Sequence, residues 1–178
     1  MRDPVEDFKD RLASLMSRGG ISEEDQTASN TLLLSCAAGE AYAMEILETR
    51  IRASPAYFAL GQVALDTLRR DRENSWEKRL TWLQHSGIPS LRGERSVQTF
   101  QILIEVRNTL LHGSGEMTTR QADSVRKFIA LKKRINSLPG VQADGRRLVL
   151  QGAFRDEWVS IAMNFVEHLS YQHQENRS

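Results

Sequence analysis

The sequence has little cysteine and almost no net charge, and each of these features excludes a class of protein. Cys36 is the only cysteine among 178 residues, so an intrachain disulfide and a zinc site built from several thiolates are both excluded. We expect Cys36 to be a small buried thiol, because it lies inside the apolar run NTLLLSCAAGEAYAMEIL. With 24 basic and 23 acidic residues the net charge is +1, and no overall basic field indicates a nucleic-acid partner.

Long hydrophobic runs and the common catalytic motifs are absent too. No window approaches the roughly 18 apolar residues of a membrane span, and the acidic N-terminus MRDPVEDFKDRL has no apolar signal core. We therefore expect a cytoplasmic protein with no membrane partner. There is no GxxxxGK[ST] or GxGxxG loop, no HExxH and no GxSxG. His168 and His173 are five residues apart, a poor spacing for a metal pair on a helix. We predict neither a metal nor a cofactor.

Most of the chain has the apolar periodicity of amphipathic helices. Asp3 and Pro4 suit the start of an N-terminal helix within residues 1–21. The capping-box pattern SEED at 22–25 opens a long helix that continues to about residue 51. Along one side of this helix lie Leu33, Ala37, Glu40, Ala41, Met44 and Leu47. Further helices are predicted over 55–71, 75–89, 96–113, 118–140 and 154–172.

One segment breaks the helical pattern. Asp144-Gly145 is a two-residue hairpin signal, and residues 141–150 flank it as a small β-ribbon. No internal repeat, low-complexity linker or change in composition divides the chain. The sequence therefore predicts one domain over 1–178, with its core over about 22–172 and a fraying tail at 173–178. Its class is all-α, an up-down helical bundle with a small β-hairpin before the last helix.

The segment RNTLLHG at 107–113 concentrates polar groups near the end of one predicted helix. That helix carries Val97, Phe100, Ile104, Arg107 and Leu111 on one stripe. Asn108 and His112 are four residues apart and stand on the same side of the helix, with Arg107 at the edge of that sector. The arginine fork matches phosphate oxygens, and histidine is the side chain best suited to general acid–base work near neutral pH.

This segment resembles the R-N-x(3)-H motif of the HEPN superfamily, the higher eukaryotes and prokaryotes nucleotide-binding domains. Arg107 and His112 are separated by four residues, the shortest common form of the motif. The run LLLSCAAGEAYAMEIL is similar to the family's second helix, in which an acidic residue often faces the cleft, and Glu40 matches that place. The likeness spans about residues 25–170, but only 107–112 are specific enough to be a motif.

The resemblance implies a homodimer in which two such segments face each other across a cleft. Active members are metal-independent endoribonucleases, many of them toxins or antiviral defence effectors that cut RNA and are paired with a neutralising antitoxin. On that basis Arg107 would bind and neutralise the scissile phosphate, His112 would act as acid and base, and Asn108 would fix the imidazole. Glu40 would have a supporting role.

Other interpretations stay open. The same cleft would serve a non-catalytic HEPN-like module that binds a nucleotide or a protein partner, and the chain would also fit a purely structural bundle. Locally, Arg107 would then be an ion-paired side chain, and His112 would satisfy the last helix carbonyls before Gly113. Asn108 either orients His112 or caps the helix. In the loop LRGER at 91–95, Arg92 and Arg95 are possible contacts for an RNA backbone.

Overall fold

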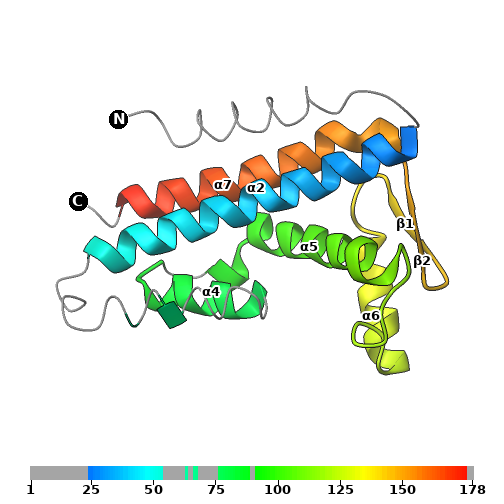
Figure 1. Cartoon of the computed structure of the whole chain (residues 1–178), viewed down its shortest axis with the longest axis horizontal. Helices are drawn as coiled ribbons and strands as arrows, with labels where there is room; N and C mark the ends of the chain where they lie inside the picture. The colour runs from blue at the N-terminus through cyan, green and yellow to red at the C-terminus, as the bar shows by residue number, and fades with distance from the viewer. Residues whose placement is uncertain (1–23, 54–62, 64–65, 68–75, 89–90, 176–178) are drawn as a thin grey trace.

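The computed structural model describes residues 24–53, 63, 66–67, 76–88 and 91–175 (Figure 1). The described chain is mainly helical and has one small antiparallel hairpin directly before the last helix, as predicted. The predicted N-terminal helix lies outside the described residues, as does most of the one at 55–71. The elements are α2 (Glu24–Ala53), α4 (Trp76–His85), η2 (Leu91–Gly93), α5 (Arg95–Gly113), α6 (Val125–Ile135), β1 (Val141–Asp144), β2 (Arg147–Leu150), η3 (Gly152–Phe154) and α7 (Arg155–Glu175).

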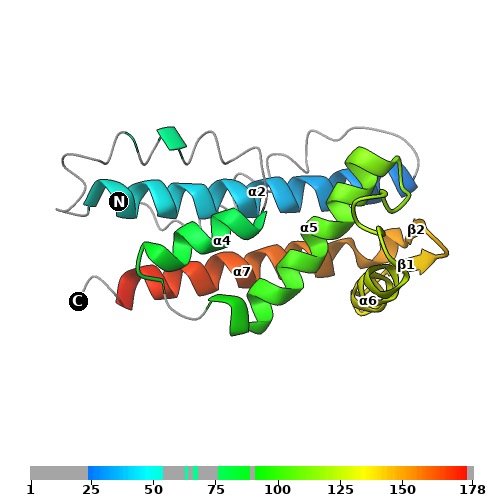
Figure 2. The same ribbon diagram turned by 90° about the horizontal axis from the view of Figure 1, so that it is seen from below.

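Two long helices form the body of the bundle. Helices α2 and α7 lie side by side and run in the same direction, while α5 runs the opposite way across one face of this pair (Figures 1 and 2). Helix α4 packs against α2 on that same face. Helix α6 and the hairpin gather at the end of the bundle where α5 finishes and α2 and α7 begin. The C-terminal turns of α5 therefore stand at a junction of several elements.

An aromatic cluster joins α4, α5 and α7 in the core. The rings of Phe100 and Phe165 stack in parallel with centroids 4.3 Å apart. Trp76 meets both of them edge-on, at 5.3 Å and 5.6 Å. On the other side of Phe100, α2 approaches so closely that a Cβ atom at Gly39 would lie 2.5 Å from the Phe100 Cζ atom. The glycine thus sets the distance between α2 and α5.

Helix α2 is packed by other helices on two of its sides. Ala37 and Ala41 are exposed, and Leu33 and Met44 are only half-buried. This stripe is not the buried side, because α2 is packed by α7 on one side and by α4 and α5 on another. Small and aliphatic residues are covered on both of these sides, namely Ala28, Leu32, Ser35, Cys36, Gly39, Ala43, Ile46 and Leu47.

The start of α6 and the hairpin loop differ from the prediction. Helix α5 ends at Gly113, and Ser114 takes the left-handed conformation that follows it, with φ of 51°. Helix α6 begins at Val125, because the Oγ atom of Ser124 caps it by accepting a hydrogen bond from the Lys127 N–H at 3.3 Å. In the hairpin Asp144 pairs with Arg147, so the loop lies one residue later than predicted, with Gly145 at φ of 55°.

Gln121 fixes one side of the C-terminal half of α5. Gln121, in the connection to α6, donates from Nε2 to the Glu105 carbonyl at 3.1 Å and to the Glu105 Oε2 atom at 3.0 Å. Its Nε2 also lies 3.1 Å from the Thr109 hydroxyl. This contact covers the Thr109 side of the helix. Leu111, on the opposite side of the helix, is 53% exposed.

Among the described helices, none is both long enough and apolar enough to cross a membrane.

The Gly39 contact predicts a reversal of the usual effect of glycine in a helix. At an ordinary helical position, replacing glycine by alanine stabilises the fold by up to about 1 kcal/mol. Here the new methyl group overlaps Phe100, which cannot swing aside because it is stacked on Phe165. We expect the free energy of unfolding to fall by about 1–3 kcal/mol, measured by urea denaturation. The exposed control Ala37→Ser should change it little, and a stabilised Gly39→Ala variant would contradict the close approach.

Candidate active site

A single carboxylate connects three helices at the centre of the site. The Oε1 atom of Glu40, on α2, accepts a hydrogen bond from Nη1 of Arg79, on α4, at 2.5 Å. The same oxygen accepts from Nη2 of Arg107, on α5, at 2.6 Å. Since α2, α4 and α5 meet at this one atom, the place of the Arg107 guanidinium is set by tertiary structure rather than by its own helix.

These charged groups are largely removed from solvent. The side chains of Arg79, Glu40 and Arg107 are 13%, 16% and 20% exposed. Ion pairs at this depth are screened less by water and salt than surface pairs. The guanidinium of Arg79 also lies over the ring of Trp76, with its Cζ atom 5.9 Å from the ring centroid, within the range of a cation–π contact.

Cys36 lies one helical turn before Glu40 and shares its surroundings. Its Sγ atom lies 3.6 Å from the Leu103 carbonyl, and the side chain is fully buried. Burial raises the pKa of the Cys36 thiol well above its usual range; the positive charge of Arg107 opposes this shift and the negative charge of Glu40 adds to it. The thiol therefore stays protonated and is a packing group, as the sequence predicted, not a nucleophile.

The rest of the RNTLLHG segment forms the open sector of the last turns of α5. At 100° per residue, His112 stands about 140° round the helix from Arg107 and about 7.5 Å further along it. Asn108 and Leu111 lie between them in angle. His112 and Leu111 are exposed and Asn108 is half-buried. Arg107 and His112 are thus the two edges of one accessible sector, and they do not touch each other within a single chain.

Within the described ranges, no hydrogen-bond partner accounts for His112. The carbonyl of Thr109, near the end of the helix, accepts from the backbone N–H groups of Ser114 and Gly115, so His112 is not needed to cap it. Among the described residues, neither His112 nor Asn108 makes a side-chain hydrogen bond, either with the other or with a third group. An exposed imidazole without a structural role is available for chemistry or for an interface.

The remaining predicted residues fall into two groups. Glu40 is brought directly onto Arg107. Arg95 is exposed at the first position of α5, about 18 Å along the helix from Arg107, and so it does not join this cluster. The backbone of Arg92 lies in η2, but its side chain is outside what the structure describes.

Arg79 is a site residue that the sequence analysis did not identify. It lies in WEKRLTWLQH, where one arginine on an amphipathic helix gives no sign of a distant partner. The available signal was Trp76 one turn earlier: a tryptophan and an arginine three residues apart share a helix face, so the arginine stem lies beside a buried ring. The carboxylate on α2 was not predictable from this spacing.

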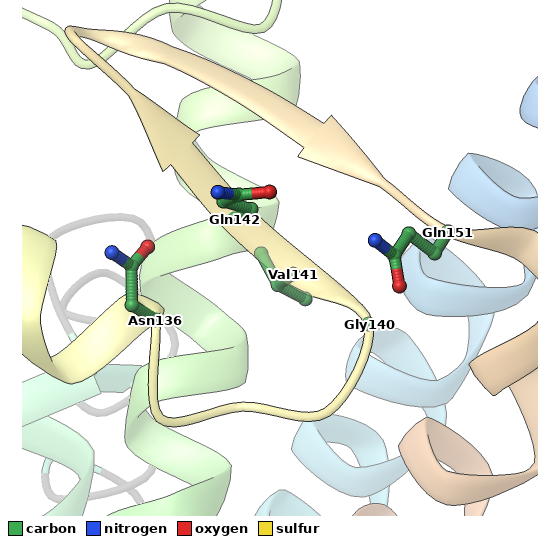
Figure 3. A pocket seen from close by; sticks show the side chains of 5 residues that line it. All are labelled: Asn136, Gly140, Val141, Gln142 and Gln151. Atoms are coloured by element: carbon green, nitrogen blue, oxygen red, sulfur yellow. The ribbon is translucent and has the colours of Figure 1, made fainter.

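A shallow hollow lies elsewhere, at the base of the hairpin (Figure 3). Its lining residues are Asn136, Gly140, Val141, Gln142 and Gln151, none of them titratable. The Oδ1 atom of Asn136 is occupied by the Ala143 N–H at 2.7 Å. This hollow is not the place of the chemistry. Within the described ranges, no group of three or more His, Cys, Asp or Glu side chains is arranged to hold a metal ion.

Because two arginines share the Glu40 carboxylate, we expect its neutralisation to destabilise the fold more than neutralisation of an exposed carboxylate does. Glu40→Gln removes the carboxylate charge that two largely buried guanidinium groups share, so we expect the free energy of unfolding to fall by about 2 kcal/mol. Asp123→Asn removes an exposed carboxylate that also receives a hydrogen bond at 2.6 Å, from Lys127. This control should hardly move the urea midpoint, because solvent screens such pairs. Equal effects of the two substitutions would contradict a structural role for Glu40.

Comparison with known proteins found no match to the chain, whether among family models, curated proteins or solved structures.

Proposed function

We propose that the protein is a metal-independent endoribonuclease of the HEPN type that acts as a homodimer. The observation that carries this proposal is the position and the hydrogen bonding of the Arg107 guanidinium. Glu40 holds its guanidinium by one hydrogen bond only, at the edge of an accessible sector that also presents Asn108 and His112. A fixed cation and an exposed imidazole, at the two edges of one accessible sector, are the two kinds of group that phosphodiester cleavage requires.

The chemistry follows from RNA itself. A base removes the proton of the 2′-hydroxyl, the 2′-oxygen forms a bond to phosphorus, and the bond from phosphorus to the 5′-oxygen breaks. An acid gives the leaving oxygen its proton, and the products are a 2′,3′-cyclic phosphate and a 5′-hydroxyl. In this proposal His112 moves the protons and Arg107 stabilises the charge that builds up on the phosphate oxygens. Asn108 lies between Arg107 and His112 around the axis of α5. In this proposal its side chain contacts the imidazole or the substrate.

The dimer is part of the proposal because one imidazole cannot be base and acid in the same step. A second copy supplies a second His112 and a second Arg107. Leu111 supports this assembly: it is an apolar side chain, 53% exposed, in the middle of the sector that Arg107 and His112 bound. A twofold axis through this sector would bury Leu111 of both copies and would bring the two polar pairs to a common groove.

The biological part of the proposal is a toxin or defence effector that cuts cellular RNA, restrained by an antitoxin or another neutralising protein. It comes from the resemblance of the motif, and RNA is the substrate class that the proposed chemistry requires. Since the net charge is only +1, substrate affinity has to come from local cations such as Arg107 rather than from an overall field.

One observation favours a second candidate, a HEPN-like module that binds a nucleotide or a partner without cleaving it. Arg107 and His112 do not meet within one chain, whereas anion binding needs Arg107 alone. The two candidates differ on overexpression in a bacterial host. Growth arrest that is relieved by Arg107→Ala and by His112→Ala supports the nuclease, and a harmless wild-type protein supports the binding module.

His112→Ala gives the direct test in vitro. Because His112 is exposed and makes no hydrogen bond in the described structure, its removal should leave helical content and the unfolding midpoint unchanged. Cleavage of tRNA should fall at least about a hundredfold, the usual scale of a general acid–base contribution. His85→Ala, another exposed histidine at the end of α4, is the matched control and should cleave normally. If wild-type and His112→Ala proteins cut equally, the activity is a contaminant and the proposal is lost.

A further inference from the structure

The two arginines bind Glu40 in an unusual way. An arginine commonly pairs with a carboxylate through two parallel N–H···O bonds, one to each oxygen. Here Arg79 and Arg107 each direct a single terminal nitrogen to the same oxygen, Oε1, at 2.5 Å and 2.6 Å. Neither guanidinium forms the two-bond fork with Glu40.

Arg107 is left with unused donors as a result. Its bond to Glu40 is the one side-chain hydrogen bond that it makes within the described part of the chain, and its buried Nε atom has no acceptor there. A buried N–H without a partner is costly, and such groups in native proteins are often completed by a ligand. An oxyanion at the exposed edge of Arg107 can accept charge-assisted bonds from the terminal N–H groups that Glu40 leaves unused.

Arg79 is held firmly enough to keep the arrangement in place. It is only 13% exposed, and its guanidinium lies over Trp76, whose ring is fixed against Phe100 and Phe165. In this arrangement both arginines bond Oε1 of Glu40, and Arg107 makes no bond to Oε2. Without Arg79, a two-bond pair between Glu40 and Arg107 becomes the best arrangement for the carboxylate.

We propose that Arg79 is a positioning residue that keeps the Arg107 guanidinium open to a phosphodiester anion by competing for Glu40. The identity of the ligand as a nucleic-acid phosphodiester rests on the proposed function, but the competition itself does not. Arg79 acts through Glu40 and needs no contact with the substrate. In this site Arg79 anchors the Glu40 carboxylate, and Arg107 binds the ligand.

The test measures binding of a 2′-deoxy dinucleotide, which has one phosphodiester and no 2′-hydroxyl and therefore cannot be cleaved by this route. Titration calorimetry at fixed low salt is done on the full chain. Arg79→Met should weaken binding about tenfold, because Glu40 closes on Arg107. Arg79→Lys retains a cation for Oε1 and should bind within about threefold of wild type. Arg126→Met, which removes an exposed arginine on α6, is the control for lost positive charge.

The double variant Arg79→Met/Glu40→Gln separates positioning from stability. If Arg79 acts by competition, removing the carboxylate frees Arg107 again, and the double variant should bind more tightly than Arg79→Met alone. A merely structural role predicts the opposite order, since the double variant loses more interactions. Thermal unfolding of each protein without ligand reports folding, and Arg79→Gln, whose shorter neutral side chain cannot anchor Oε1 by charge, replaces Arg79→Met if the latter does not fold.

Several results would overturn the inference. They are a wild-type protein that does not bind the dinucleotide, an Arg79→Met variant that binds as tightly as wild type, and a double variant no tighter than the single one. If binding follows the predicted order and RNA is nevertheless not cut, the nuclease proposal fails and the role of Arg79 stands. If Arg107→Met loses binding while Arg79→Met keeps it, the role of Arg79 fails and the nuclease proposal stands.

Discussion

The contact on which the site depends is the Glu40 carboxylate, shared between Arg79 and Arg107. It joins α2, α4 and α5 at one oxygen atom, in surroundings where charges are poorly screened. The apolar packing around it is equally specific: Gly39 lets α2 approach Phe100, and the stacked aromatic rings fix Trp76 beneath Arg79. The same contacts that hold the helices together therefore set the place of the cation at the edge of the open sector.

One chain supplies only half of what the proposed chemistry needs. Arg107 is fixed and partly buried, His112 is exposed and unsupported, and about 140° of helix separates them. This separation is a difficulty for catalysis inside a monomer. It is no difficulty in a symmetric pair, where each groove takes side chains from both copies and Leu111 is covered by its counterpart. Arg107 is anchored through the core, whereas His112 would be completed only at the dimer interface. Activity would therefore depend on dimer formation.

The sequence was informative where local rules dominate. Helical periodicity placed α4, α5 and α7 within a few residues, and the Asp-Gly pair located the hairpin to within one residue of its loop. It failed where tertiary contacts decide. The buried sides of α2 depend on two neighbouring layers. Glu40 was a candidate only because of the motif resemblance, whereas Arg79 was missed because nothing local to α4 indicates a carboxylate on α2.

The most direct test of the dimeric site is the distance between the two RNTLLHG segments in solution. Leu111→Cys can be joined by a bismaleimide spanning on the order of 10 Å, since two imidazoles serving one phosphate must lie that close. The buried Cys36 thiol should not react. We predict rapid covalent dimer formation for Leu111→Cys and none for Gln98→Cys, an exposed position in the N-terminal half of the same helix. A Leu111→Cys protein that cleaves RNA but stays uncrosslinked would contradict the shared groove.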